Sequence, residues 1–251
     1  TIRQGVVNAV ETFSPIGDRL RRAGAFCLDV VFPPVCARCR RVGTLLCADC
    51  RAQMVPVVEP VCQFCGRATE ANHTVGGVCA ECGQSPPLLR QMRAPLRYQE
   101  PTSGLIHRLK YEGYFALAAP LALCLIDGWP SWEWPPDLIA PIPLHPRRRR
   151  QRGYNQSELL ARPLAAAVGV AHSATALRRT RHTVPQVGLG PEARADNVRG
   201  AFEADADVVV GRRVLLVDDV LTTGATMTAA AEALLAAGAL AVSAYCLARV
   251  S

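Results

Sequence analysis

Four cysteine pairs with identical spacing constrain this chain more than any other feature. Two residues separate the cysteines of each pair, a spacing that lets two thiolates bind one metal ion from a tight turn. The eight cysteines lie within 47 residues, and they are Cys36, Cys39, Cys47, Cys50, Cys62, Cys65, Cys79 and Cys82. Eight thiolates suffice for two zinc ions with four sulfur ligands each. We therefore predict two structural zinc sites (Zn²⁺) with no coordination position left open for catalysis.

The cysteines can be grouped around the two ions in more than one way. Sequential grouping puts the first two pairs on one ion and the last two on the other, whereas crossed grouping joins the first pair to the third. We favour sequential grouping, because a short hairpin can close each site alone. A redox C-x-x-C normally occurs once, at the start of a helix, so a thiol oxidoreductase is disfavoured. Cys27, Cys124 and Cys246 stand in apolar surroundings, and we interpret them as buried core residues.

Composition restricts the class of protein and of partner. The 251 residues are 50% hydrophobic and 20% charged, which argues against a disordered chain. Lys and Arg number 28 against 21 Asp and Glu, so the formal charge is +7, which suits a phosphate ester or a nucleic acid. No apolar run reaches the ~18 residues of a membrane span. We find no signal peptide in the first thirty residues, so a cytoplasmic location is the default expectation.

Three segments with different patterns follow one another along the chain. Residues 1–31 resemble an amphipathic helical segment, 32–88 the metal-binding module, and 89–251 an α/β domain. Within the last, apolar strands alternate with helical runs, which implies an α/β fold with a parallel sheet. The strands are expected at 138–144, 214–217 and 242–247, and the helices at 105–109, 115–126, 157–168 and 226–237. Asn155, followed by Glu158, resembles a capping box for the third of these helices.

The stretch VLLVDDVLTTGATM, residues 214–227, carries the clearest chemistry. An apolar strand is followed by Asp218 and Asp219, and then by a loop of small residues that opens a helix. Such a loop offers backbone N–H groups and hydroxyls to a phosphate at a helix N-terminus. The two carboxylates would repel that phosphate, but they can accept hydrogen bonds from a neighbouring diol. Phosphate on one side and vicinal hydroxyls on the other describe a ribose 5-phosphate.

This segment closely resembles the phosphoribosyl-pyrophosphate motif of type I phosphoribosyltransferases. The resemblance implies that Asp218 and Asp219 are the catalytic acids that hold the 2- and 3-hydroxyls of the ribose. The residues that would wrap the 5-phosphate are Thr222, Thr223, Gly224, Ala225 and Thr226. Purine-salvage members of that superfamily carry an aspartate where Thr222 stands, and a threonine cannot act as a base near neutral pH. Hypoxanthine or guanine salvage is therefore disfavoured.

Further segments resemble the ComF family of competence proteins, the GntX-like group, over nearly the whole chain. They are LDVVFPPVCARC, LKYEG, PIPLHPRRRRQRGYNQSELLA and PQVGLGPEARADNVRGAF. The resemblance implies a type I phosphoribosyltransferase fold behind an N-terminal double zinc ribbon. It further implies that Arg152, in the position of the pyrophosphate loop, Lys110, and Arg194, in a mobile flap with Gln186 and Asn197, contact the substrate. Mg²⁺ would accompany the pyrophosphate, whose charge the site must neutralise.

Two functions of different classes remain. One is an enzyme that transfers a phosphoribosyl group from phosphoribosyl pyrophosphate to an unknown acceptor, with inversion at C1. The alternative is a non-catalytic component of DNA uptake that senses the ligand, or binds single-stranded DNA or a DNA-uptake protein. The +7 charge favours the second slightly, but aromatic residues make up only 6% of the chain, so we do not expect the interleaved aromatics of a base-stacking groove.

Overall fold

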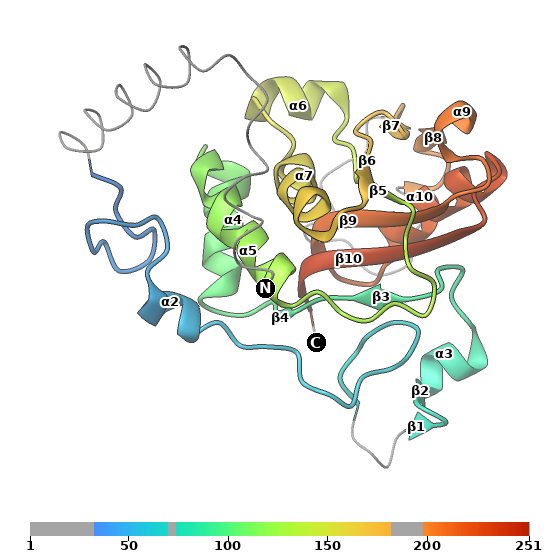
Figure 1. The fold of residues 1–251 in the computed structure, drawn as a ribbon, viewed down its shortest axis with the longest axis horizontal. Helices are drawn as coiled ribbons and strands as arrows, with labels where there is room; N and C mark the ends of the chain where they lie inside the picture. The colour runs from blue at the N-terminus through green and yellow to red at the C-terminus, as the bar shows by residue number, and fades with distance from the viewer. Residues whose placement is uncertain (1–32, 70–73, 182–197, 251) are drawn as a thin grey trace.

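A parallel β-sheet forms the centre of the molecule, as Figure 1 shows. The computed structural model describes residues 33–69, 74–181 and 198–250. The strands of the sheet, in spatial order, are β3 (Met92–Arg93), β10 (Ala241–Arg249), β9 (Arg213–Leu221), β5 (Leu138–Pro141) and β6 (Ala171–His172), with β4 (Leu96–Arg97) also paired to β10. All of these pairings are parallel. The α/β class expected from the sequence is confirmed.

Two hydrophobic cores cover the two faces of this sheet. On one face lie α4 (Thr102–Tyr111), α5 (Ala118–Asp127) and α7 (Gln156–Val168), whose buried leucines and alanines pack on alternate residues of β5, β9 and β10. On the other face lies α10 (Ala225–Ala236), with the antiparallel strand pair β7 (Leu177–Arg179) and β8 (Phe202–Ala204). Burial on both faces explains why these strands are continuous apolar runs.

The cysteine-rich segment contributes only short elements. They are α2 (Ala48–Ala52), β1 (Thr74–Val75), β2 (Val78–Cys79) and α3 (Ala80–Gln84). Cys47 and Cys79 are the N-cap residues of α2 and α3, so the second cysteine pair of each half opens a helical turn. In Figure 1 these two turns lie at well-separated places along the side of the molecule where β4 and β3 run.

Strand β9 is longer than the sequence predicts. The expected strand ended at Val217 and released the two aspartates into a loop, whereas β9 continues through Asp218 and Asp219 to Leu221. Strand β9 stays paired with β10 over this extension, since Cys246 lies opposite Asp218 and Arg249 opposite Leu221. Helix α10 then begins at Ala225, one residue earlier than expected, with Gly224 at φ +83° as its N-cap. The connection is therefore a short, tight turn.

The other expected elements are present with shifted bounds. Strand β5 ends at Pro141 rather than at 144, because prolines at 141 and 143 have no N–H to donate. The helical run at 115–126 divides into a 3₁₀ turn η2 (Phe115–Leu117) and α5. Two further short helices, α6 (Pro146–Arg152) and α9 (Ala206–Val209), were not expected, and the arginine run that the sequence placed in a loop forms α6. The expected helical segment at 1–31 lies outside the described residues.

Candidate functional site

The acidic pair lies where the direction of strand succession reverses. The chain passes from β5 outward to β6 and from β9 outward to β10, so the order reverses between the adjacent strands β5 and β9. Ligands of open α/β sheets bind at the carboxyl ends of the strands at such a point. Asp218 and Asp219 lie there on β9, and the N-terminus of α7, which follows β5, faces them: Ser157 Oγ donates to Asp218 Oδ1 at 2.6 Å.

Asn155 explains how Ser157 reaches the acidic pair. Its side chain accepts from the N–H of Ser157 at 3.1 Å and donates to the carbonyl oxygen of Ile142 at 3.0 Å. The N-cap predicted from the sequence is thus confirmed, while Glu158 contacts Arg149 at 3.5 Å. Ser157 itself was not among the expected site residues. Its place two residues after an N-cap, directly beyond a buried strand, is the signal that could have identified it.

Lys110 is brought to the acidic pair from α4. Its Nζ lies 2.6 Å from Asp219 Oδ1, and the side chains are 20% and 3% exposed, so the ion pair is largely buried. The other oxygen, Asp219 Oδ2, is buried and has no hydrogen-bond partner among the residues that the structure describes. A buried carboxylate oxygen without a donor is costly, and it marks a position where a ligand hydroxyl or a cation could bind.

The charges in this group shift one another's pKa. Burial, with the neighbouring charge of Asp219, raises the pKa of Asp218 to about 7, although Lys110 and the Ser157 hydroxyl oppose the shift. Burial disfavours the charged form of Lys110, but Asp219 and Asp218 outweigh it and raise the pKa of the amine. Near neutral pH the site therefore holds a lysine cation beside an acidic pair in which Asp218 is only partly ionised.

The turn after β9 contains the residues predicted to bind the 5-phosphate. Thr223 is exposed, Thr222, Ala225 and Thr226 are half-buried, and Gly224 is buried. Thr223 Oγ1 accepts from the N–H of Ala225 at 3.4 Å, which is a long bond that a ligand oxygen can replace. The positive φ of Gly224 turns the chain into α10, whose N-terminus carries a partial positive charge.

The arginines expected to contact the substrate show no contact with the acidic pair in the described structure. Arg152 ends α6, where its guanidinium lies 5.3 Å from the ring centre of Tyr111 and donates to Gln156. Arg194, like Gln186 and Asn197, lies outside the described residues. Arg179 in β7, which the sequence analysis did not select, is buried and attracted electrostatically by Asp218. Burial lowers its pKa to about 10.

An aromatic cluster borders the site at α4 and η2. The residues Tyr111 and Phe115 are 60% and 62% exposed. The ring of Phe115 lies 6.1 Å from that of Tyr154, and the ring of His107 lies 4.9 Å from that of Tyr111. Folding thus gathers rings that are scattered in the sequence and places the Arg152 guanidinium over the Tyr111 ring.

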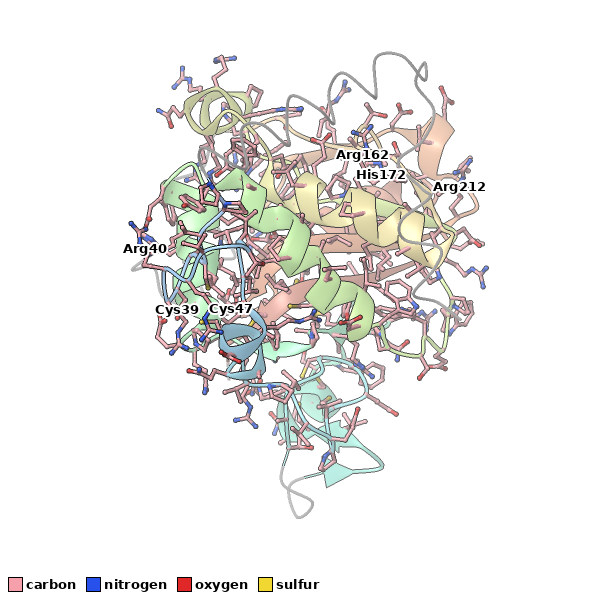
Figure 2. The ribbon with its side chains drawn as sticks, turned by 60° about the vertical axis from the view of Figure 1, so that its left-hand side comes forward. Cys39, Arg40, Cys47, Arg162, His172 and Arg212 are labelled. Carbon is pink, nitrogen blue, oxygen red and sulfur yellow. The ribbon has the colours of Figure 1, made fainter. Side chains whose placement is uncertain are left out.

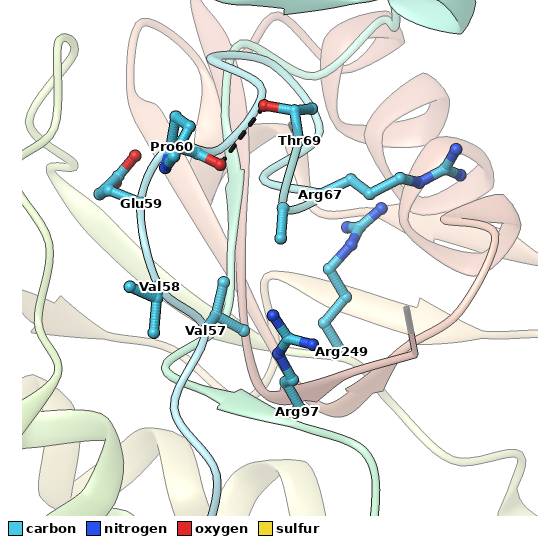
Figure 3. A pocket seen from close by; sticks show the side chains of 9 residues that line it. Val57, Val58, Glu59, Pro60, Arg67, Thr69, Arg97 and Arg249 are labelled. Atoms are coloured by element: carbon cyan, nitrogen blue, oxygen red, sulfur yellow. Dashed lines mark hydrogen bonds between the residues drawn. The ribbon is translucent and has the colours of Figure 1, made fainter. Parts of the chain in front are cut away.

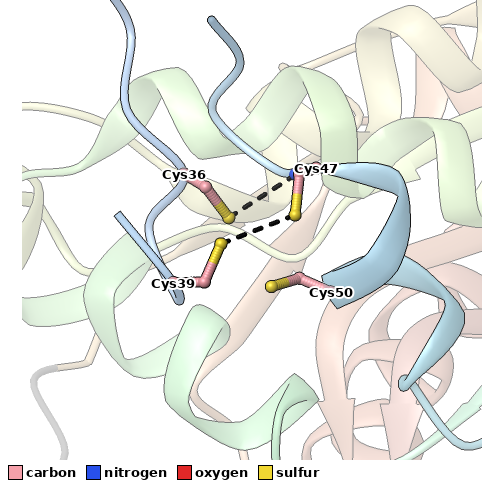
Figure 4. Close-up of side chains that lie close together, drawn as sticks. All are labelled: Cys36, Cys39, Cys47 and Cys50. Carbon is pink, nitrogen blue, oxygen red and sulfur yellow. Dashed lines mark hydrogen bonds between the residues drawn. The ribbon is translucent and has the colours of Figure 1, made fainter. Parts of the chain in front are cut away.

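The eight paired cysteines form two clusters of four, grouped sequentially. In each cluster the sulfur atoms all lie within 4.8 Å of one another. Cys39 Sγ and Cys47 Sγ are 3.6 Å apart, as Figure 4 shows, and Cys65 Sγ and Cys79 Sγ are 3.9 Å apart. Four sulfurs at ~2.3 Å from a central zinc would be roughly 3.8 Å from one another. The donor set and its spacing therefore fit a tetrahedral zinc ion in each cluster.

The two clusters lie against different faces of the sheet. The first cluster, Cys36 to Cys50, belongs to the core of α4, α5 and α7, and the second, Cys62 to Cys82, to the core of α10. Figure 2 shows Cys39, Cys47 and Arg40 together at one edge of the molecule, on the opposite side from Arg162 and His172. Cys124 and Cys246 are buried outside both clusters, as the sequence suggested.

Sequence comparisons match two separate stretches of the chain to two different families. Residues 27–85 match the family model of the double zinc ribbon domain, and residues 156–251 match that of the phosphoribosyl transferase domain. The chain is 34% identical over 223 residues to the DNA utilization protein YhgH of Escherichia coli, covering 81% of this chain and 96% of that protein. It is 33% identical over 207 residues to competence protein F of Haemophilus influenzae, covering 76% of this chain and 86% of that protein.

Part of the chain is similar to a solved structure. The adenine phosphoribosyltransferase from Thermoanaerobacter pseudethanolicus is 20% identical, with a TM-score of 0.33, over 51% of this chain and 67% of that one. Over the described part of the chain, no helix has the length and apolarity needed to cross a bilayer.

Proposed function

Because this chain belongs to the family of the DNA utilization protein YhgH and competence protein F, with a double zinc ribbon before a phosphoribosyltransferase domain, we propose that it binds phosphoribosyl pyrophosphate at the end of β9. We further propose that it transfers the phosphoribosyl group to an acceptor. The arrangement of the acidic pair carries the proposal. Asp219 Oδ2 is buried without a partner in the described structure, directly before a glycine turn that opens a helix.

Each part of the site has a role in this proposal. The turn of residues 222–226 binds the 5-phosphate through backbone N–H groups and hydroxyls. Asp218 and Asp219 accept hydrogen bonds from the 2- and 3-hydroxyls, and Ser157 and Lys110 keep the two carboxylates in position for them. Arg152, Arg179 and Arg194 supply positive charge for the pyrophosphate.

The reaction is a substitution at C1. The bond from C1 to the pyrophosphate oxygen breaks, and pyrophosphate leaves with the electron pair. The acceptor forms its new bond to C1 from the opposite face and gives up its proton. Cationic side chains that lie near the departing group favour the step, because negative charge accumulates there in the transition state.

Magnesium fits the same group of residues. Its preferred ligands are carboxylate and phosphate oxygens, and Asp219 Oδ2 is a buried carboxylate oxygen without a described partner. When bound, the ion would neutralise charge on the pyrophosphate. Asp218 and Asp219 would hold it, directly or through water.

We propose that both cysteine clusters hold zinc and that the chain has two functional units. Residues 32–88 would form the double zinc ribbon and 89–251 the phosphoribosyltransferase domain, after a helical segment at 1–31. The sulfur spacing and the matches to the two family models support this division. Metal analysis of the purified protein should give about two zinc ions per chain.

Release of pyrophosphate tests the enzymatic proposal. Purified protein is incubated with phosphoribosyl pyrophosphate, Mg²⁺ and a panel of acceptors, and pyrophosphate is measured. The proposal expects release that depends on one acceptor and is lost in the Asp218→Asn/Asp219→Asn variant. If release stays absent with every acceptor while the ligand still binds, the chain is a ligand sensor and not a transferase.

A second candidate function is binding of single-stranded DNA as a component of DNA uptake. The relatives named for DNA utilization and competence support it, as does the +7 charge. The specific observation is the exposed pair Tyr111 and Phe115 with Arg152 over the Tyr111 ring, since bases stack on such surfaces. Oligonucleotide binding that weakens steeply with salt and with Tyr111→Ala supports this function, and no binding at low salt removes it.

A further inference from the structure

A pocket of about 430 Å³ lies between the second half of the cysteine-rich segment and the carboxyl end of the sheet. Its residues are Val57, Val58, Glu59, Pro60, Arg67, Ala68, Thr69, Arg97 and Arg249. Arg97 ends β4 and Arg249 ends β10, while Arg67 follows the third cysteine pair. In Figure 3 Arg97 and Arg249 extend into the space beside Val57, the Arg67 side chain extends away from it, and Glu59 lies on the opposite side. Segments far apart in the sequence thus bring three guanidinium groups together.

Two of the three arginines have a hydrogen-bond or ion-pair partner in the described structure. Arg249 is 6% exposed and donates to the carbonyl oxygen of Cys65. Arg67 forms an ion pair with Glu81 at 2.6 Å. A zinc ion with four thiolates would carry a net charge of −2. Arg249 and Arg93, which donates to the carbonyl oxygen of Cys62, lie close enough to balance it.

The side chain of Arg97 differs from the other two. Its guanidinium makes no hydrogen bond or ion pair with any residue in the described ranges. The buried Nε of Arg249 likewise has no hydrogen-bond acceptor in the described part of the chain. Glu59 lines the same pocket, but its carboxylate accepts from the N–H of Val61 at 2.8 Å and forms no bond to Arg97 or to Arg249 Nε within the described residues. The pocket therefore contains an uncompensated cation and an unused buried donor.

We propose that this pocket binds a phosphate group, with Arg97 as its main contact and Arg67 and Arg249 beside it. Guanidinium groups suit phosphate oxygens, because their N–H donors match them in pairs. Val57, Val58 and Pro60 form an apolar wall opposite, which suits the uncharged part of a phosphorylated molecule. The volume lies in the range of small-molecule pockets. The phosphate belongs either to a small phosphorylated molecule or to a nucleic-acid backbone, and the inference is independent of the proposed phosphoribosyl site.

Titration with inorganic pyrophosphate tests the inference on the full-length, zinc-loaded chain. The titration is done by calorimetry without Mg²⁺ at fixed ionic strength. Arg97→Gln should weaken binding about tenfold, as expected for one lost charge-assisted contact. Arg178→Gln is the matched control, because Arg178 is an exposed arginine paired with Glu203 elsewhere on the surface, and its affinity should equal that of the wild type.

Two further measurements distinguish the loss of a direct phosphate contact from damage to the zinc clusters or to the phosphoribosyl site. Zinc content and the circular dichroism spectrum should be unchanged in Arg97→Gln, whose side chain contacts neither cysteine cluster in the described structure. Arg152→Gln removes an arginine proposed to face the pyrophosphate at the end of β9, and the tenfold loss on Arg97→Gln should persist in that background. Failure of the phosphoribosyl site and failure of this pocket are thereby distinguishable. Equal affinity of Arg97→Gln and wild type, or loss of zinc in Arg97→Gln, overturns the proposal. Displacement of pyrophosphate by a short oligothymidylate assigns the phosphate to a nucleic-acid backbone, and no displacement assigns it to a small molecule.

Discussion

The two cysteine clusters share one local structure, but the protein surrounds them differently. In both, the N–H of the first cysteine bonds to the carbonyl oxygen of an arginine five residues later, Arg41 or Arg67. In both, that arginine forms an ion pair with an acid in the first turn of the following helix, at 2.5 Å to Asp49 and 2.6 Å to Glu81. The same sequence pattern therefore produces the same metal-binding hairpin twice.

The difference is visible at the residue after the second cysteine of each hairpin. Arg40 stands there in the first hairpin at φ +65°, and Gly66 in the second at φ +68°. Arg40 is exposed, and its side chain extends into solvent. A Cβ on Gly66 would overlap the carbonyl oxygen of Met92 in β3. The first hairpin can accept a side chain at the strained position because this position is exposed among the described residues, whereas the second must have glycine because it packs against the sheet.

This packing connects the second cluster to the phosphoribosyl site. The N–H of Met92 donates to the carbonyl oxygen of Phe64 at 2.7 Å, and Met92 Sδ would lie 3.5 Å from a Cβ on Gly224. Met92 thus lies between the third cysteine pair and the turn proposed to bind the 5-phosphate. The contact that the first cluster makes through Arg51 is an exposed ion pair with Asp127, at the far end of α5.

Removing one ligand from each cluster should give the largest effects. Cys79→Ser should lower the free energy of unfolding by more than about 4 kcal/mol, because metal binding and folding are coupled in such a site. It should also increase hydrogen exchange at residues 222–228. Cys47→Ser, at the equivalent position of the first cluster, should lose one zinc ion without that local increase. Equal exchange of the turn in the two variants would contradict the unequal coupling.

Exchanging the residues at the strained position should be the next most informative change. Gly66→Ala should destabilise the protein by about 3 kcal/mol, through the overlap with Met92 and the positive φ. Arg40→Gly should change stability by less than about 1 kcal/mol, since it relieves strain but frees the unfolded chain. Urea unfolding of both variants measures the difference. Similar losses would mean that the second hairpin is no more tightly packed than the first.

The acidic pair on β9, which contributes residues to both cores, should make stability depend on pH. The pKa of Asp218 is about 7 in the folded protein, above that of a free aspartate near 3.9. The folded protein therefore holds an extra proton between these values, so stability falls as pH rises from about 4 to about 7, by roughly 2 kcal/mol or more. Asp218→Asn should flatten this dependence in thermal unfolding. An unchanged slope would show that Asp218 titrates normally.

The smallest effects should come from the arginines that connect each half of the cysteine-rich segment to the rest of the protein, Arg93 to the second half and Arg51 to the first. Arg93→Gln removes a partly buried side chain that donates to the carbonyl oxygen of Cys62, and it should cost about 1–2 kcal/mol. Arg51→Gln removes the exposed pair with Asp127, and it should cost less than about 1 kcal/mol. Chemical denaturation resolves the two, and a larger loss for Arg51→Gln would reverse the comparison.

The sequence predicted local chemistry better than it predicted contacts between distant segments. The cysteine spacing indicated both clusters, and the strand, acidic pair and glycine turn indicated the site, because each is encoded within a few consecutive residues. The approach of Ser157 and Lys110 to the acids depends on how α7 and α4 pack on the sheet, and no local pattern contains that. The aromatic cluster around Tyr111 was missed for the same reason, and the length of β9 depends on its partner β10.

Direct binding of phosphoribosyl pyrophosphate tests the central claim most directly. Calorimetric titration of the zinc-loaded protein with this ligand and Mg²⁺ should show a binding heat, and Asp219→Asn should weaken the affinity of the site at the end of β9 more than about tenfold, because a buried charged acceptor for the sugar hydroxyls is lost. Undiminished affinity in that variant, or the absence of any binding heat for the wild type, would contradict the account.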